Sequence, residues 1–115
     1  MEDVPALRFA RCARVLVVAA QAAGLRVPAF RSPPGRTDAQ RTIRRRPGGD
    51  VVAVRLRDRS AAEVEADMIE GVIAANRLTG PAAEQVRVTL AAALADAGRL
   101  TSTRARVAER QTQAA

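Results

Sequence analysis

The chain has 115 residues, 48% of them hydrophobic, and a net charge of +7, which suits one small domain. All 19 basic residues are arginine, and the sequence contains no histidine, no lysine and one cysteine. This composition excludes histidine-dependent catalysis, a zinc finger, a lysine Schiff base and a disulfide within the chain. No G-x-G-x-x-G or P-loop motif is present. We therefore predict a non-enzymatic protein that uses no cofactor and no metal.

The first predicted element is a helix over residues 6–24, where Phe9, Cys12 and Leu16 recur at helical spacing and Gly24 ends the pattern. Its apolar surface extends almost all round the helix. We expect it to lie centrally in the core or to form a homo-oligomer with a second copy. The apolar run 15–20 is too short for a secretory signal or a membrane span, so we expect a cytoplasmic protein with no membrane contact.

Three strands are predicted next. Residues 27–30 suit a short edge strand, because Pro28 lacks the amide donor that an interior strand needs. Residues 41–59 then predict an arginine-rich β-hairpin, with its turn at Pro47-Gly48-Gly49-Asp50.

The turn sets the register of the hairpin. With a loop of two or four residues, Arg46 pairs with Val51, whereas a loop of three residues slips the pairing by one. Alternation then places Ile43, Val52, Val54 and Leu56 on a packed face, together with Arg41 and Arg45. The same alternation places Arg44, Arg46, Arg55 and Arg57 on the solvent face.

Two further helices are predicted as an antiparallel pair. Ser60 and Glu63 form a capping box at the start of the first, and Gly80-Pro81 opens the second. Gly98 is expected to end it. The fold class is therefore α+β: a helix, a short edge strand and a β-hairpin, then two helices. We expect the first two helices to cover the packed face of the sheet together. We expect residues 1–98 to form a single domain and residues 99–115 a flexible basic C-terminal tail.

The positive charge is concentrated in the centre of the chain. Residues 26–59 contain ten arginines and three aspartates, whereas residues 60–98 carry a net negative charge. Because guanidinium groups bind phosphates with two parallel hydrogen bonds, we predict that the hairpin contacts the backbone of DNA or RNA. The predicted binding residues are Arg44, Arg46, Arg55 and Arg57, assisted by Arg31, Arg36, Arg41 and Arg45. Aromatic residues are absent from this face, which favours recognition of the backbone over base stacking.

The sequence leaves three alternatives open. The first is a protein interaction or regulatory module that docks an acidic or apolar surface of a partner protein. The second is that the arginines form an ordinary solvated face, enriched by coding bias and partly paired with the acidic stripe of the second helix. The least favoured alternative is a metal-dependent nuclease that uses Asp50, Asp58, Asp67 and Glu70.

Overall fold

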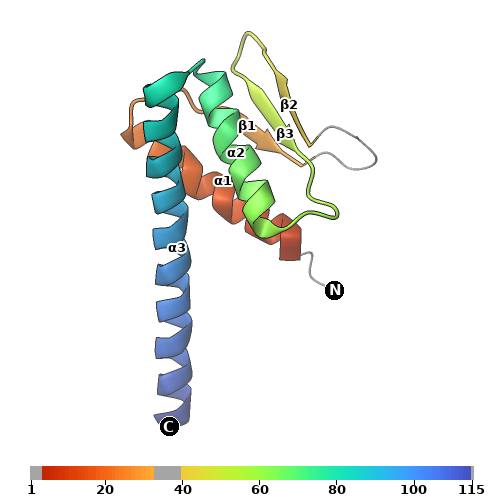
Figure 1. Ribbon diagram of the computed structural model, residues 1–115. Helices are drawn as coiled ribbons and strands as arrows, with labels where there is room; N and C mark the ends of the chain where they lie inside the picture. The colour runs from red at the N-terminus through yellow and green to blue at the C-terminus, as the bar shows by residue number, and fades with distance from the viewer. Residues whose placement is uncertain (1–3, 33–39, 115) are drawn as a thin grey trace.

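The computed structural model describes residues 4–32 and 40–114, which form three helices and one three-stranded sheet (Figure 1). The elements in chain order are α1 (Val4–Ala22), β1 (Ala29–Arg31), β2 (Arg41–Arg44), β3 (Val51–Val54), α2 (Ala61–Ala75) and α3 (Gly80–Ala114). The predicted α+β class and the predicted order of elements are confirmed.

The sheet has the strand order β1-β3-β2, so β3 is central. β1 runs parallel to β3, and Phe30 pairs with Val52. β2 runs antiparallel to β3. The prediction that the first strand lies at an edge is confirmed, and Pro28 comes directly before this strand, where its missing amide donor breaks no ladder bond.

The predicted register of the hairpin is wrong by two residues. Val51 pairs with Arg44, not with Arg46, and Val52 pairs with Ile43. The loop covers residues 45–50 and is longer than expected, because Arg45 and Asp50 form an ion pair across it and leave the strand ladder. Within the loop, the Gly49 amide donates a hydrogen bond to the Arg46 carbonyl (3.0 Å). Since side chains alternate at period two, a shift of two residues leaves the packed face unchanged.

Helix α2 begins at the predicted capping box. The Ser60 hydroxyl accepts a hydrogen bond from the Glu63 amide, and the Glu63 carboxylate accepts one from the Ser60 amide, both at 3.1 Å. These two bonds satisfy amide groups that otherwise lack a partner at a helix N-terminus. The hydrogen bonds to Ser60 also lower the pKa of the Glu63 carboxyl.

Helix α2 lies directly on β3. Gly71 is buried, and a Cβ atom at this position would lie 2.6 Å from Cγ1 of Val52. Glycine therefore allows the helix to approach the central strand more closely than any other residue would permit. This close contact fixes which face of the sheet is covered.

The core is formed by side chains from all three helices and from β3. Its largest fully buried side chains are Leu16, Val52, Val54, Met68, Val72 and Leu90. We expected the first two helices to cover the sheet together. Instead α2 makes the main contacts with β2 and β3, whereas α1 packs chiefly against α3 and α2.

The predicted end of the last helix at Gly98 is wrong, because α3 continues to Ala114. A glycine inside a helix costs about 1 kcal/mol relative to alanine but does not block the backbone hydrogen bonds. The residues that follow are rich in alanine, arginine and glutamine, which favour helix. α2 and α3 run in opposite directions, as predicted, and the C-terminal half of α3 projects away from the sheet (Figure 1).

A pair of charged side chains connects α2 to α3. Arg87 of α3 donates hydrogen bonds to the carboxylate of Glu70 in α2, with Nη2 3.2 Å from Oε2, and to Glu84 at 3.3 Å. These bonds from Arg87 are the main cause that lowers the pKa of Glu70 below its ordinary value of 4.5, and the positive charges of Arg87 and Arg41 add to the effect.

The close contact at Gly71 makes a stability prediction. Gly71→Ala gains about 1 kcal/mol of helix propensity, but overpacking against the stiff, buried Val52 costs about 1–3 kcal/mol, so we expect net destabilisation. The matched control is Gly98→Ala, where nothing lies within 4 Å of the added methyl group. That variant should gain about 1 kcal/mol. Urea unfolding compares the two, and a stabilised Gly71→Ala variant would refute the close contact.

The Glu70–Arg87 pair makes a pH prediction. Because folding lowers the pKa of Glu70, the stabilisation is present above pH 4.5 and is lost as the pH falls through the folded-state pKa. The stability difference between the parent and Glu70→Gln should be a few tenths to about 1 kcal/mol near neutral pH, after solvent screening, and should shrink in acid. Urea unfolding at several pH values measures it. A difference that stays constant with pH would contradict this assignment.

Candidate functional site

Three arginines share the face of the sheet that α2 does not cover. Arg31 of β1 pairs with Ala53, and Arg44 of β2 pairs with Val51. Because side chains alternate along a strand, both arginines point to the face opposite the buried side chain of Val52. Arg55 continues the ladder, because its amide donates a hydrogen bond to the Gln40 carbonyl (3.0 Å). Arg31 and Arg44 are exposed, whereas Arg55 is half-buried. We call Arg31, Arg44 and Arg55 the outer arginine face.

The structure divides the eight predicted binding residues among several positions. Arg44 and Arg55 lie on the same face, as predicted, and Arg31 joins them. Arg46 is exposed in the hairpin turn, and Arg57 is exposed in the loop after β3, so neither belongs to a strand. The list is completed by Arg36, which lies outside the described residues, and by Arg41 and Arg45, which lie on the packed side.

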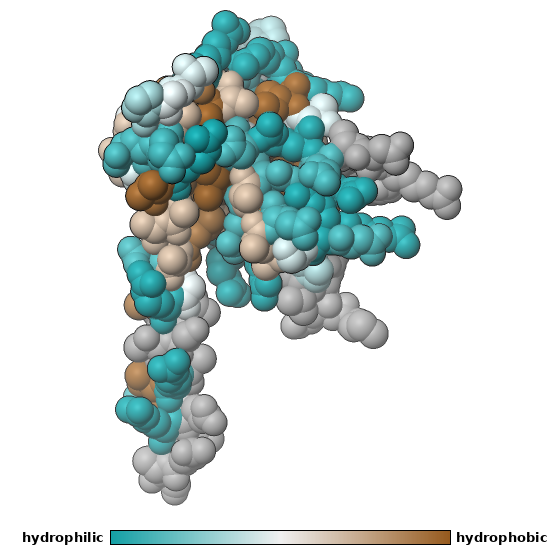
Figure 2. Space-filling model, viewed as in Figure 1, coloured by the Kyte–Doolittle hydropathy of each residue, from teal (hydrophilic) through white to brown (hydrophobic). Residues whose placement is uncertain are grey.

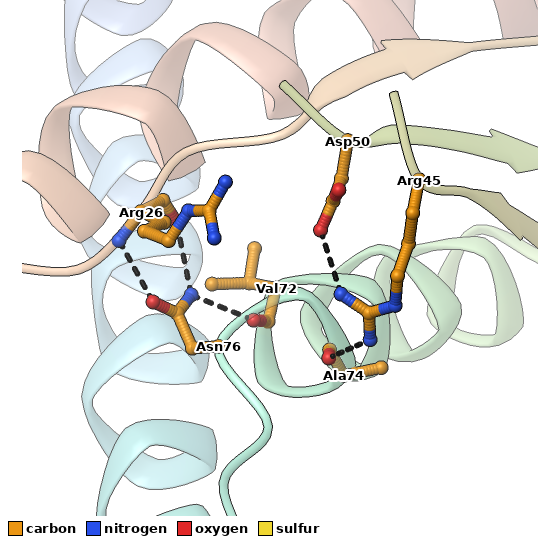
Figure 3. A network of polar contacts seen from close by, with 6 residues as sticks. All are labelled: Arg26, Arg45, Asp50, Val72, Ala74 and Asn76. Atoms are coloured by element: carbon orange, nitrogen blue, oxygen red, sulfur yellow. Dashed lines mark hydrogen bonds and ion pairs between the residues drawn. The ribbon is translucent and has the colours of Figure 1, made fainter. Parts of the chain in front are cut away.

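Arg45 has a structural partner on each side. Its Nη1 lies 3.0 Å from Oδ2 of Asp50, and its Nη2 donates to the Ala74 carbonyl in the last turn of α2, also at 3.0 Å (Figure 3). Asp50 is only 7% exposed, so its charge needs this partner. The guanidinium also lies at a helix C-terminus, where positive charge is favourable, and gives the Ala74 carbonyl a second hydrogen bond beside the one from the Arg77 amide. Arg45 therefore holds the hairpin loop against α2, and we remove it from the binding set.

Asn76 fixes the segment before β1, a role that the sequence analysis missed. Its side-chain oxygen accepts a hydrogen bond from the Arg26 amide (2.8 Å), and its side-chain nitrogen donates to the carbonyls of Arg26 and Val72 (both 2.9 Å; Figure 3). An asparagine just after a predicted helix is a signal for a cap, but nothing in the sequence indicates that it reaches residue 26. Through these bonds the end of α2 positions the strand that carries Arg31.

Other arginines are neutralised by acids. The side chain of Arg59 is only 3% exposed, and its Nη1 forms an ion pair with Asp67 of α2. Arg87 pairs with Glu70, and Arg99 pairs with Asp96. The acidic stripe of α2 therefore pairs with arginines outside the predicted binding set. The outer arginine face, Arg46 and Arg57 form no ion pair with any residue in 4–32 or 40–114.

The four acids considered for a metal site are not brought together. Asp50 pairs with Arg45, Asp67 with Arg59 and Glu70 with Arg87. Within the residues that the structure describes, no group of three or more acidic, cysteine or histidine side chains is arranged to hold a metal ion. The arrangement gives no support to the nuclease alternative.

A small cavity of about 120 Å³ lies where the first turns of α1 and α2 meet, and Cys12 forms part of its wall with Arg8, Phe9 and Glu65. The Cys12 thiol donates to the Glu65 carboxylate at 3.7 Å. Burial raises the pKa of this thiol, and the charge of Glu65 and the hydrogen bond to it add to the effect. A raised pKa keeps the sulfur in its unreactive thiol form, so Cys12 behaves here as a buried apolar residue.

Comparison with known proteins gives no relative from which a function can be transferred. The chain matches no family model, no curated protein and no solved structure. Among the described helices, none combines the length and apolarity that a membrane-spanning segment requires.

The contacts of Arg45 make a prediction that separates structural from free arginines. Arg45→Gln leaves the buried Asp50 without its ionic partner and removes one of the two hydrogen bonds to the Ala74 carbonyl, so we expect a loss of about 1–2 kcal/mol of stability. Arg44→Gln removes the same charge from the outer face, and its effect should stay within about 0.5 kcal/mol. Urea unfolding of the two variants measures the difference. Equal stabilities would show that the contacts of Arg45 contribute nothing.

Proposed function

We propose that this protein binds the phosphate backbone of nucleic acid through the outer arginine face, with Arg46 and Arg57 at its ends. The main support for the proposal is a contrast between two sets of arginines. Arg45, Arg59 and Arg87, which contact α2, pair with acids. The arginines on and around the uncovered face of the sheet have no acidic partner among the described residues. Unpaired charges on one face attract an anionic ligand.

The geometry of a sheet suits this role. Neighbouring strands lie about 4.8 Å apart and residues advance about 3.3 Å along a strand, so the Cα atoms of Arg31 and Arg55 are separated by roughly 8 Å. Arginine side chains from different strands can therefore reach adjacent phosphates. Each guanidinium donates up to five hydrogen bonds in a planar fork that matches phosphate oxygens.

Recognition should depend on the backbone and its shape. The only aromatic residues of the chain are Phe9, which is buried in α1, and Phe30, which packs against the core from the covered side of the sheet. Neither is on the outer face, so the base-stacking platform of many single-strand binders is missing.

We also propose a non-enzymatic role and a cytoplasmic location, the latter supported by the free and buried Cys12.

The proposal makes a prediction for binding in salt. Labelled duplex DNA, single-stranded DNA and RNA are titrated with the protein by fluorescence anisotropy at several salt concentrations. If Arg31, Arg44, Arg46 and Arg57 each contact a phosphate, log affinity for the best ligand should fall against log salt with a slope of about −3 to −4. The variant with these four residues changed to glutamine should lose most of the affinity and most of the slope.

The control variant loses the same number of positive charges at positions outside the sheet. Arg8, Arg11, Arg26 and Arg77 are exposed and lie outside the sheet, so changing these four to glutamine gives an equal net charge. This control variant should keep most of the slope. Equal losses in the two variants would indicate a diffuse attraction by net charge, and absence of binding at low salt would end the proposal.

A further inference from the structure

The last part of α3 extends beyond the body of the molecule. We call residues 99–114 the α3 overhang, and Figure 1 shows it projecting away from the sheet and the other helices. Most helices in proteins are stabilised by packing of an apolar face, because isolated segments of about 12–15 residues are only marginally helical in water. A projecting helix of this length is therefore a candidate for an interaction with another molecule.

The overhang carries an apolar stripe that continues from the body. Leu100 is 52% exposed and Val107 is 46% exposed. They are seven residues apart, and Ala93 lies seven residues before Leu100, so all three share one side of the helix. Apolar residues also continue along the projecting part of α3 in the space-filling view (Figure 2).

Within the body, the same stripe leads into a groove. Ala93 lines a groove of about 400 Å³ with residues of α1. The α1 residues that line it are Arg14, Val15, Val18, Ala19 and Ala22. Three of the lining residues are alanines, of which Ala19 and Ala93 are half-buried, and Val18 is largely exposed. We call Val15, Val18, Ala93, Leu100 and Val107 the α1–α3 strip.

The charges around this strip select its occupant. The overhang contains four arginines and one glutamate. Arg106 and Arg110 are exposed, whereas Arg99 is already paired with Asp96. Arg14 borders the groove on α1. A second copy of the chain would bring another +7 charge and the same basic overhang to this surface. An acidic segment would be attracted to it instead, because opposite charges steer and favour association.

We propose that the α1–α3 strip docks an amphipathic helix of a partner protein, with leucine-like side chains facing the strip and acidic residues facing the flanking arginines. Helix-in-groove recognition of this kind uses anchors at helical spacing. The strip belongs to the helices and the outer arginine face belongs to the sheet. This inference therefore does not rest on nucleic-acid binding, and the two are tested separately.

The test uses a designed probe. A labelled 21-residue peptide carries leucine at the two apolar heptad positions and glutamate at the positions beside them, and its scrambled form serves as the control peptide. We expect the full-length protein to bind the amphipathic peptide and not the scrambled one. Leu100→Ala/Val107→Ala removes apolar contact area but keeps every charge and a strong helix former, so Kd should rise at least about tenfold.

The matched control is Val88→Ala. Val88 is 56% exposed on α3, but it lies five residues before Ala93, about 140° round the helix from the strip. Its substitution should leave Kd unchanged, and circular dichroism should show the same helix content in all variants. Unchanged binding by the double variant, equal binding of the scrambled peptide or no peptide binding would overturn the proposal. So would a dimer in sedimentation equilibrium that the same double variant dissociates, since a second copy would then occupy the strip.

Discussion

The close contact between Gly71 of α2 and Val52 of β3 determines which face of the sheet is covered and which is exposed to solvent. Because the helix backbone approaches the central strand so closely, one face of a small sheet is covered by a single helix. Val52 and Val54 then lose all contact with solvent. Alternation along the strands sends their neighbours to the opposite face, where the unpaired arginines lie. The proposed binding surface is thus a consequence of the packing on the other side of the sheet.

Two polar links hold the sheet edges to the end of α2. Arg45 joins the hairpin loop to the Ala74 carbonyl, and Asn76 joins the segment before β1 through Arg26. Both links are made within three residues of the C-terminus of α2. This one helix terminus therefore contacts the segments that lead to both edge strands, and with them it helps to position Arg31 and Arg44.

Much of the fold follows from local signals in the sequence. The capping box at Ser60 and Glu63 and the alternation of valines each specify a local feature, and those features are present. The register did not follow, because loop length depends on how Arg45 and Asp50 pair across the loop and on α2, which is a tertiary contact. The sequence also contains no signal for the parallel pairing of β1 with β3 or for the contact between Asn76 and the Arg26 backbone, which joins residues 50 positions apart. The length of α3 was misjudged because a glycine signals a helix end only when nothing beyond it favours helix.

In the candidate site, too, the sequence identifies the basic segment, but only the fold shows which of its arginines have acidic partners. This difference decides how the high arginine content of the chain should be interpreted. Coding bias raises the frequency of arginine wherever the codon allows it, but it does not choose partners. Sequence alone placed Arg44, Arg45 and Arg59 in one basic segment. The fold assigns them different environments: Arg59 is buried against Asp67, Arg45 bridges Asp50 and α2, and Arg44 is exposed on an uncovered sheet. A buried charge without a partner of opposite sign is costly, so the buried side chain of Arg59 needs Asp67 and the buried Asp50 needs Arg45, whereas the exposed Arg44 needs no acid. Only arginines of the third kind can exchange water for phosphate without breaking a contact that holds the protein together, so the relevant charge is that of the unpaired set and not the net +7 of the chain.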